Sequence, residues 1–209
     1  MRQQKRGAQQ VRIIGGKWKG RKLRFNGNTS LRPTLGRTRE TLFNWLRPYI
    51  QDTRCLDVFA GSGILGFEAL SQGAANIVMV EQNPITVRSL QASAIQLEAE
   101  HQSRIIKSDA LAFLRREQSR FDIVFVDPPF SQPELLAKTL QILREGDVVR
   151  HFVYTEARTL DELERVAKGS GWQIAKQTQA GDTCSALLTP TADLQPCITD
   201  ANIRGLRES

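Results

Sequence analysis

The sequence predicts an α/β fold, a doubly wound and mostly parallel β-sheet that carries a small basic extension at its N-terminus. Apolar runs alternate with helical patterns from residue 54 onward, and strands that alternate with helices pair in parallel. The chain of 209 residues is 40% hydrophobic, which suffices for one sizeable core. Residues 1–47 contain 13 Lys or Arg and a single acid, Glu40, so the extension carries the excess positive charge.

The N-terminal 50 residues form the predicted extension. Residues 1–10 are polar and basic and have too little apolar surface to order themselves, so we predict a disordered arm. Two short apolar segments, 11–14 and 23–25, flank a glycine-containing turn and predict a β-hairpin with a cationic tip. Apolar residues at helical spacing then predict a helix over residues 40–49. We assign residues 11–50 to this hairpin and helix.

Residues 51–189 carry the alternating pattern of the main domain. Apolar, β-branched runs predict strands at 54–59, 76–81, 103–107, 121–127 and 150–156. Helical patterns predict helices at 64–72, 84–98, 109–117, 132–145 and 160–168. Two further apolar segments, 172–178 and 183–188, complete the sheet. The composition turns polar at Pro190, so residues 190–209 are expected to form a poorly ordered tail.

Composition also excludes several classes of protein. No run approaches 18 apolar residues, and the N-terminus lacks the apolar region of a signal peptide, so we expect a cytoplasmic protein without a membrane partner. Cys55, Cys184 and Cys197 are far apart and lack CxxC spacing, which argues against a disulfide framework and a zinc site. We expect no metal and, by default, a monomer. The basic N-terminal segment favours a polyanionic partner.

A glycine-rich turn follows the first strand of the main domain. Residues 61–66 read GxGxxG and open the next helix, where glycines allow a ligand to approach the backbone and the amides of the first helical turn face it. Glu81 ends the second strand, 20 residues after Gly61, where a carboxylate can bind ribose hydroxyls. This combination fits a nucleoside cofactor, and both NAD and S-adenosylmethionine satisfy it.

Two other acids favour S-adenosylmethionine. Asp57 lies in the first strand just before the turn, where its carboxylate would hold the ammonium group of an amino-acid-bearing cofactor and would repel a pyrophosphate. Asp109 follows the third strand, where an acid could read an adenine amino group or simply cap the following helix. The acids at three successive strand ends therefore indicate a cofactor with an amino acid tail.

The fourth strand ends in Asp127-Pro128-Pro129-Phe130. Two successive prolines fix the backbone and offer no amide hydrogen, so Asp127 and the Pro128 carbonyl would project rigidly beside the glycine turn. Two acceptors can hold both hydrogens of an exocyclic amine and orient its nitrogen for attack on a sulfonium methyl group. Phe130 could stack on the base that carries this amine. The four residues are our predicted catalytic site.

These motifs identify a resemblance. Over residues 11–188 the chain resembles the bacterial 16S ribosomal RNA guanine-N2 methyltransferases, which are Rossmann-like enzymes with an Asp/Asn-Pro-Pro-Phe/Tyr motif. The segments that carry the match are residues 12–16, 20–23, 31–34, 37, 39–46, 57–63 and 126–130. The resemblance implies a seven-stranded sheet with helices on both faces. It also implies methyl transfer from S-adenosylmethionine to a guanine N2 amine in small-subunit ribosomal RNA.

The resemblance also implies roles for individual residues. The cofactor would be bound by Asp57, Phe59, Ala60, Gly61, Ser62, Gly63, Glu81, Gln82, Asp109 and Ala110. Asp127, Pro128 and Phe130 would hold the target guanine, with Pro129 in the same rigid motif. Ribosomal RNA would be contacted by Arg12, Lys17, Trp18, Lys19, Arg21, Lys22, Arg32, Arg37 and Arg39. For Trp18, stacking on a base and anchoring the hairpin are equally compatible with the sequence.

Other functions remain open on the residues alone. The same acceptors would suit methylation of adenine N6 in DNA or of a glutamine side chain in protein. A non-catalytic RNA-binding assembly factor could retain a vestigial cofactor fold, and the literal GxGxxG also allows a nicotinamide-dependent oxidoreductase. The substrate of the expected enzyme is naked 16S RNA, the small subunit or one of its assembly intermediates.

Overall fold

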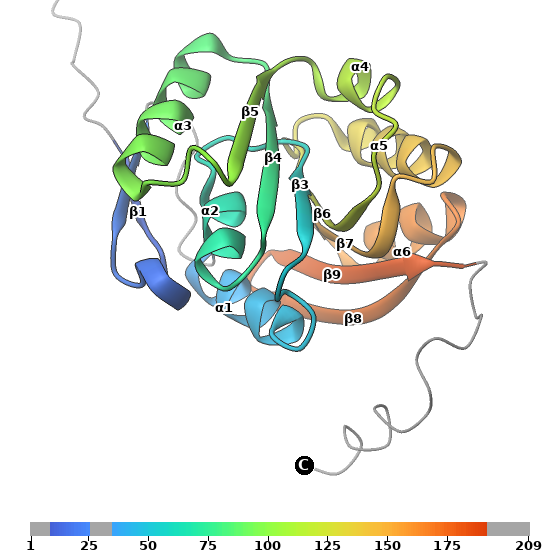
Figure 1. Cartoon of the computed structure of the whole chain (residues 1–209). Helices are drawn as coiled ribbons and strands as arrows, with labels where there is room; N and C mark the ends of the chain where they lie inside the picture. The colour runs from blue at the N-terminus through green and yellow to red at the C-terminus, as the bar shows by residue number, and fades with distance from the viewer. Residues whose placement is uncertain (1–8, 26–34, 192–209) are drawn as a thin grey trace, which may run out of the picture.

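The computed structural model describes residues 9–25 and 35–191 (Figure 1). The expected basic arm up to residue 8, the predicted RNA contact Arg32 and the tail from residue 192 lie outside the described residues. Among the described residues, no helix is both long enough and apolar enough to cross a membrane.

A seven-stranded sheet forms the centre of the main domain, in the order β5-β4-β3-β6-β7-β9-β8. Its strands are β3 (Arg54–Asp57), β4 (Asn76–Glu81), β5 (Ser103–Lys107), β6 (Phe121–Val126), β7 (Val149–Ala157), β8 (Trp172–Ala180) and β9 (Thr183–Pro190). The first five are parallel, whereas β9 runs antiparallel to both β7 and β8. The predicted doubly wound, mostly parallel sheet is therefore confirmed. Pro190 still pairs with Trp172, so the last strand includes the residue at which we expected the tail to begin.

Helices cover both faces of the sheet (Figure 1). One face carries α1 (Leu35–Leu46), α2 (Ile64–Ser71) and α3 (Pro84–Leu97), and the other carries α4 (Ala110–Leu114), α5 (Pro133–Glu145) and α6 (Leu160–Gly169). Alternation along β6 divides the core: Ile123 and Phe125 pack with the first group of helices, and Val124 and Val126 with the second. This burial on both faces explains why β6 is almost continuously apolar.

The N-terminal hairpin consists of β1 (Gln9–Arg12) and β2 (Lys22–Phe25), which pair antiparallel. Its side chains alternate, so that Leu23 and Phe25 are buried while Lys22 and Arg24 are exposed. The expected disordered arm over residues 1–10 is too long, because Gln9 and Gln10 already pair with β2. A polar strand is ordered here because its backbone hydrogen bonds are supplied by an anchored partner strand.

The segment that connects β1 to β2 packs against α2. A 3₁₀ turn at Gly16–Trp18 brings the Trp18 amide to the Ser71 hydroxyl oxygen, to which it donates at 2.9 Å. Gly16 has a φ of 72°, and a Cβ atom at this position would overlap the Ser71 backbone carbonyl. Only glycine satisfies both conditions, the left-handed backbone and the close approach to α2.

Helix α1 begins and ends earlier than the predicted helix over residues 40–49. Arg39 lies on the face of α1 that also carries Leu42, Phe43 and Leu46, and all four side chains are buried. Their spacing of three, four and seven residues is the helical period, so the helix face extends back through this arginine. Tyr49 lies beyond the helix, where it remains 41% exposed and its ring centroid is 5.0 Å from that of Phe152.

Candidate active site

The carboxyl ends of the five parallel strands meet at one edge of the sheet, beside a cavity of about 470 Å³. Nucleotide-like ligands bind at this edge in open α/β sheets. The cavity brings together the predicted cofactor residues, Gly63 excepted, and all four residues of the predicted catalytic motif. These lining residues are Asp57, Phe59, Ala60, Gly61, Ser62, Glu81, Gln82, Asp109, Ala110, Asp127, Pro128, Pro129 and Phe130.

Gly63 shapes the glycine turn from behind the cavity. Its φ is 76°, and a Cβ atom there would lie 2.5 Å from Leu90 Cδ2 and 2.8 Å from Phe67 Cε2. The residue therefore lets the turn pack closely against α2 and α3, and α2 begins directly after it at Ile64. Gly63 does not line the cavity itself, so its contact with the cofactor stays a prediction, and the requirement for glycine at this position comes from packing.

Asp57 ends β3 next to the glycine turn and is almost fully buried. Burial, with a smaller contribution from the negative charge of Glu81, raises the pKa of its carboxyl group from 3.8 to about 7. Hydrogen bonds from the backbone amides of Phe59 and Gly66 act in the opposite direction and lower this pKa. A cation bound beside Asp57 would favour the ionised carboxylate, so the position suits a positively charged ligand group.

Glu81 and Asp109 are held by backbone amides at the next two strand ends. The Gly61 amide donates to Glu81 Oε2 at 3.1 Å, and the Asn83 amide donates to Glu81 Oε1 at 2.7 Å. The Ala112 amide donates to Asp109 Oδ1 at 2.9 Å. Asp109 thus caps α4, the alternative that the sequence left open, and it also lines the cavity.

The Asp127–Phe130 motif follows β6 and continues into a turn over residues 129–132. The Gln132 amide donates to the Pro129 carbonyl at 2.9 Å, and α5 follows at Pro133. Arg158 supports Phe130: its guanidinium carbon lies 5.8 Å from the ring centroid, and its Nη2 donates to the Phe130 carbonyl at 3.5 Å. The motif is therefore held at both its backbone and its aromatic ring.

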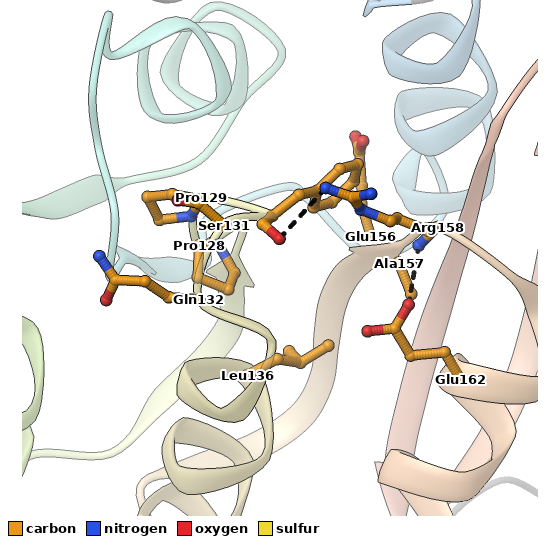
Figure 2. Close-up of a pocket in the computed structure, with 10 residues that line it drawn as sticks. Pro128, Pro129, Ser131, Gln132, Leu136, Glu156, Ala157, Arg158 and Glu162 are labelled. Atoms are coloured by element: carbon orange, nitrogen blue, oxygen red, sulfur yellow. Dashed lines mark hydrogen bonds between the residues drawn. The ribbon is translucent and has the colours of Figure 1, made fainter.

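A second hollow of about 410 Å³ adjoins the motif (Figure 2). It shares Pro128, Pro129, Phe130, Gln132 and Glu156 with the main cavity. Arg158 and Glu162 line its other part, and the Arg158 amide donates to Glu162 Oε2 at 3.2 Å. The motif and Glu156 therefore separate two adjoining hollows.

Sequence reasoning missed Tyr154 and Glu156 of β7, which also line the main cavity. Only 1% of the Tyr154 surface and 8% of the Glu156 surface are exposed. The Tyr154 hydroxyl donates to Glu156 Oε1 at 2.6 Å. Burial, followed by the negative charge of Glu156, raises the pKa of Tyr154 well above its usual 10. An acid at the carboxyl end of the fifth predicted strand was the available signal, the same signal that identified Asp57 and Glu81.

Two of the predicted RNA contacts are instead buried. Trp18 is only 8% exposed and packs in the core, so the anchoring alternative holds and its ring is not a surface stacking platform. Arg39 is 4% exposed, and its Nε lies 3.6 Å from Glu68 Oε2. Its Nη2 donates to the Arg12 carbonyl at 2.7 Å. We expected Arg39 to precede the helix and to contact RNA phosphates, but it lies within α1, on the buried helix face, and lines the active-site cavity.

The other described candidates for RNA contact are exposed basic side chains of the hairpin and α1. The exposed members are Arg12, Lys17, Lys19, Arg21, Lys22 and Arg37, and Arg24 adds a further exposed charge that sequence reasoning did not include. Phe25, at the end of β2, lines the active-site cavity. The hairpin that carries the exposed charges thus leads directly to the cavity.

Comparisons with known proteins find one matching family model and several relatives that are named as methyltransferases. The family model described as Conserved hypothetical protein 95 matches residues 11–189. The chain is 40% identical to ribosomal RNA small subunit methyltransferase D of Escherichia coli over 87% of this chain and 90% of that protein. It is 37% identical to the protein of the same name in Haemophilus influenzae, over 82% and 90% of the two chains. A solved structure of the putative methyltransferase yhhF from Escherichia coli is similar at 38% identity, with a TM-score of 0.74, over 87% and 98% of the two chains.

Proposed function

Because the chain belongs to the Conserved hypothetical protein 95 family and is similar to ribosomal RNA small subunit methyltransferases, we propose that it methylates a guanine N2 amine in 16S ribosomal RNA. It is an S-adenosylmethionine-dependent methyltransferase of the Rossmann-like class. The observation that carries the proposed chemistry is the position of Asp127–Phe130 in one cavity with three carboxylates that suit the cofactor. We propose that the enzyme acts as a cytoplasmic monomer on the small subunit or an assembly intermediate.

The residues that line the cavity offer a partner for each chemical group of S-adenosylmethionine. The Asp57 carboxylate would pair with the ammonium of the methionine part, and Glu81 would accept hydrogen bonds from the ribose hydroxyls. Asp109 and Ala110 would contact the adenine, while the segment from Phe59 to Ser62 and the side chain of Gln82 would enclose the rest. Bound in this way, the cofactor supplies a methyl group on a positively charged sulfur atom.

The catalytic motif acts on the amine of the guanine. The Asp127 carboxylate and the Pro128 carbonyl would accept its two hydrogens, which orients the nitrogen toward the methyl group. Phe130 would stack on the base and fix its plane. The nitrogen would then be aligned for attack on the methyl group that the bound cofactor supplies, and the Asp127 carboxylate would accept the proton that the nitrogen loses.

The target guanine must leave its stack to reach this cavity. A guanine paired within a helix keeps its N2 amine in the minor groove of the duplex, whereas the motif lines a cavity at the carboxyl ends of the strands. The exposed Arg and Lys side chains of the hairpin would bind the phosphates that flank the extruded nucleotide.

Binding of S-adenosylmethionine is expected to strengthen as the pH rises from about 5.5 to about 7. The pKa of Asp57 in the ligand-free protein is raised to about 7, so its carboxyl is protonated at the lower pH and must lose that proton to pair with an ammonium group. The dissociation constant should therefore fall about tenfold over this range. Calorimetry in buffers of different ionisation enthalpy should detect proton release at pH 6. Asp57→Asn should bind more weakly and without this pH dependence; equal wild-type affinity at both pH values would exclude the pairing.

Neutralising the basic hairpin is expected to weaken RNA binding and its dependence on salt. Lys22→Gln combined with Arg24→Gln removes two exposed charges from β2, the strand that ends at the cavity-lining Phe25, and each lost phosphate contact should lower the slope of log K against log salt by about 0.7 to 0.9. Binding to 16S RNA over a salt series measures this slope. The control, Lys138→Gln with Lys168→Gln on α5 and α6, removes the same charge from the other face of the sheet. Equal slopes for both variants would place the RNA elsewhere.

Methyl transfer from labelled S-adenosylmethionine tests the proposed substrate. Small subunits and naked 16S RNA from cells that lack this protein serve as acceptors, beside double-stranded DNA and a total protein fraction. We expect label in the ribosomal RNA. Label in DNA or protein would keep the enzyme class and overturn the substrate, and preference between the subunit and the naked RNA would show which form presents the guanine.

A further inference from the structure

The end of β7 places a second carboxylate beside the catalytic motif. In the parallel pairing of β6 with β7, Val126 lies opposite Thr155. Asp127 and Glu156 therefore occupy neighbouring positions one residue further along, and both line the same cavity. The mechanism described above assigns Glu156 no role, although it is 8% exposed and held by a hydrogen bond from Tyr154 at 2.6 Å.

Guanine and adenine differ in what they present to such a carboxylate. Beside its exocyclic amine, guanine carries the N1–H donor, whereas the ring nitrogen beside the amine of adenine is an acceptor. A carboxylate has about four acceptor positions and no donor when ionised, so it matches guanine and leaves an adenine lone pair opposed by negative charge. Asp127 and the Pro128 carbonyl already suit the amine hydrogens, which leaves the adjacent N1–H for a neighbouring acceptor.

We propose that Glu156 accepts the N1–H of the target guanine and thereby selects guanine over bases with an unprotonated N1, and that Tyr154 positions the Glu156 carboxylate. This inference rests on the proposed function, because it concerns the base that enters the same cavity. The Tyr154 hydroxyl is fully buried and fixes Oε1, so the carboxylate reaches the base in one orientation. Both residues also lie on one face of β7, since side chains two residues apart share a face.

The test replaces the target guanine with 2-aminopurine, which keeps the N2 amine and lacks the N1 hydrogen. The guanine that the wild-type protein methylates in 16S RNA is mapped first, and 2-aminopurine is then introduced there by ligation. We expect wild-type kcat/KM to favour guanine by roughly 10- to 100-fold, the discrimination typical of a well-placed base contact. In Glu156→Gln the amide can donate to the bare N1, so this preference should shrink to about threefold or less.

Two further variants distinguish a loss of the preference for guanine over 2-aminopurine from a general loss of activity. Glu162→Gln makes the same change in the adjoining hollow but outside the main cavity, and it should keep the wild-type preference. Tyr154→Phe removes the hydroxyl that positions Glu156; it should narrow the preference, whereas a purely structural role would lower kcat/KM for both bases equally.

Each outcome bears on one claim. A wild-type protein that methylates no guanine defeats the proposed function itself. A wild-type protein that methylates guanine and 2-aminopurine equally well overturns the role of Glu156 without reference to any variant. Wild-type discrimination that persists unchanged in a folded Glu156→Gln variant overturns it too, while leaving the proposed function intact.

Discussion

Replacing Asp127 with alanine is expected to lower kcat for methyl transfer by about 10²- to 10³-fold, the usual effect of removing one preorganised electrostatic group at a reacting centre. Asp127 follows β6 and lines the cavity together with the cofactor carboxylates. Its carboxylate would orient the amine and accept the departing proton, and both effects are strongest in the transition state. Binding of S-adenosylmethionine should change little, because in the proposed site other residues would contact the cofactor.

Two comparisons make the Asp127 experiment specific. Asp127→Asn keeps an oxygen acceptor of the same shape, so it should retain more activity than Asp127→Ala. Asp122→Ala removes a carboxylate from the start of the same strand, outside the cavity, and should leave kcat within about threefold of the wild-type value because it touches no reacting atom. The rate of single-turnover methyl transfer at saturating cofactor is measured for all three variants. Near-normal turnover of Asp127→Ala would show that the amine is held elsewhere.

Replacing Glu68 with alanine is expected to lower the free energy of unfolding by about 3 to 5 kcal/mol, because it leaves the buried Arg39 without its counter-ion. Glu68 is fully buried in α2. It accepts hydrogen bonds from the Ile14 amide at 3.0 Å and the Gly15 amide at 2.8 Å, and from Gln72 Nε2 at 2.8 Å. One side chain therefore ties the hairpin, α1 and α2 together.

Denaturant unfolding and limited proteolysis measure this effect. The loss is a large part of the 5 to 15 kcal/mol that typically stabilises a domain, and cleavage should begin within the hairpin because two of its amides lose their acceptor. Glu40→Ala is the control, since Glu40 is an exposed acid on α1 and should change stability by less than about 0.5 kcal/mol. A Glu68→Ala protein as stable as this control would mean that the pair does not hold the hairpin in place.

The main domain could be predicted well because its central strands are buried on both faces. Runs such as Phe121–Val126 are apolar at almost every position, so both their presence and their parallel pairing follow from the sequence alone. The acids at the strand ends, Asp57, Glu81, Asp109 and Asp127, were predictable for the same reason, since parallel strands deliver their carboxyl ends to one edge of the sheet.

The hairpin and α1 were less predictable because their order depends on distant residues. A buried arginine reads as a surface charge until its partner is known, and Glu68 lies on a different helix, outside the reach of any local pattern. Likewise, the requirement for glycine at residue 16 comes from the Ser71 carbonyl of α2. The burial of Trp18 and Arg39 could not be predicted for this reason, because it is a consequence of docking onto the main domain.

Nucleoside analysis of methylated small-subunit RNA tests the central claim most directly. Small subunits from cells that lack this protein are incubated with the purified chain and labelled S-adenosylmethionine, and the RNA is then digested to nucleosides. We expect the label in N2-methylguanosine with the wild-type protein and a loss of this label with Asp127→Ala. Label in N6-methyladenosine or any other nucleoside would contradict the guanine assignment, and RNA without label despite measurable cofactor binding would contradict the proposed function.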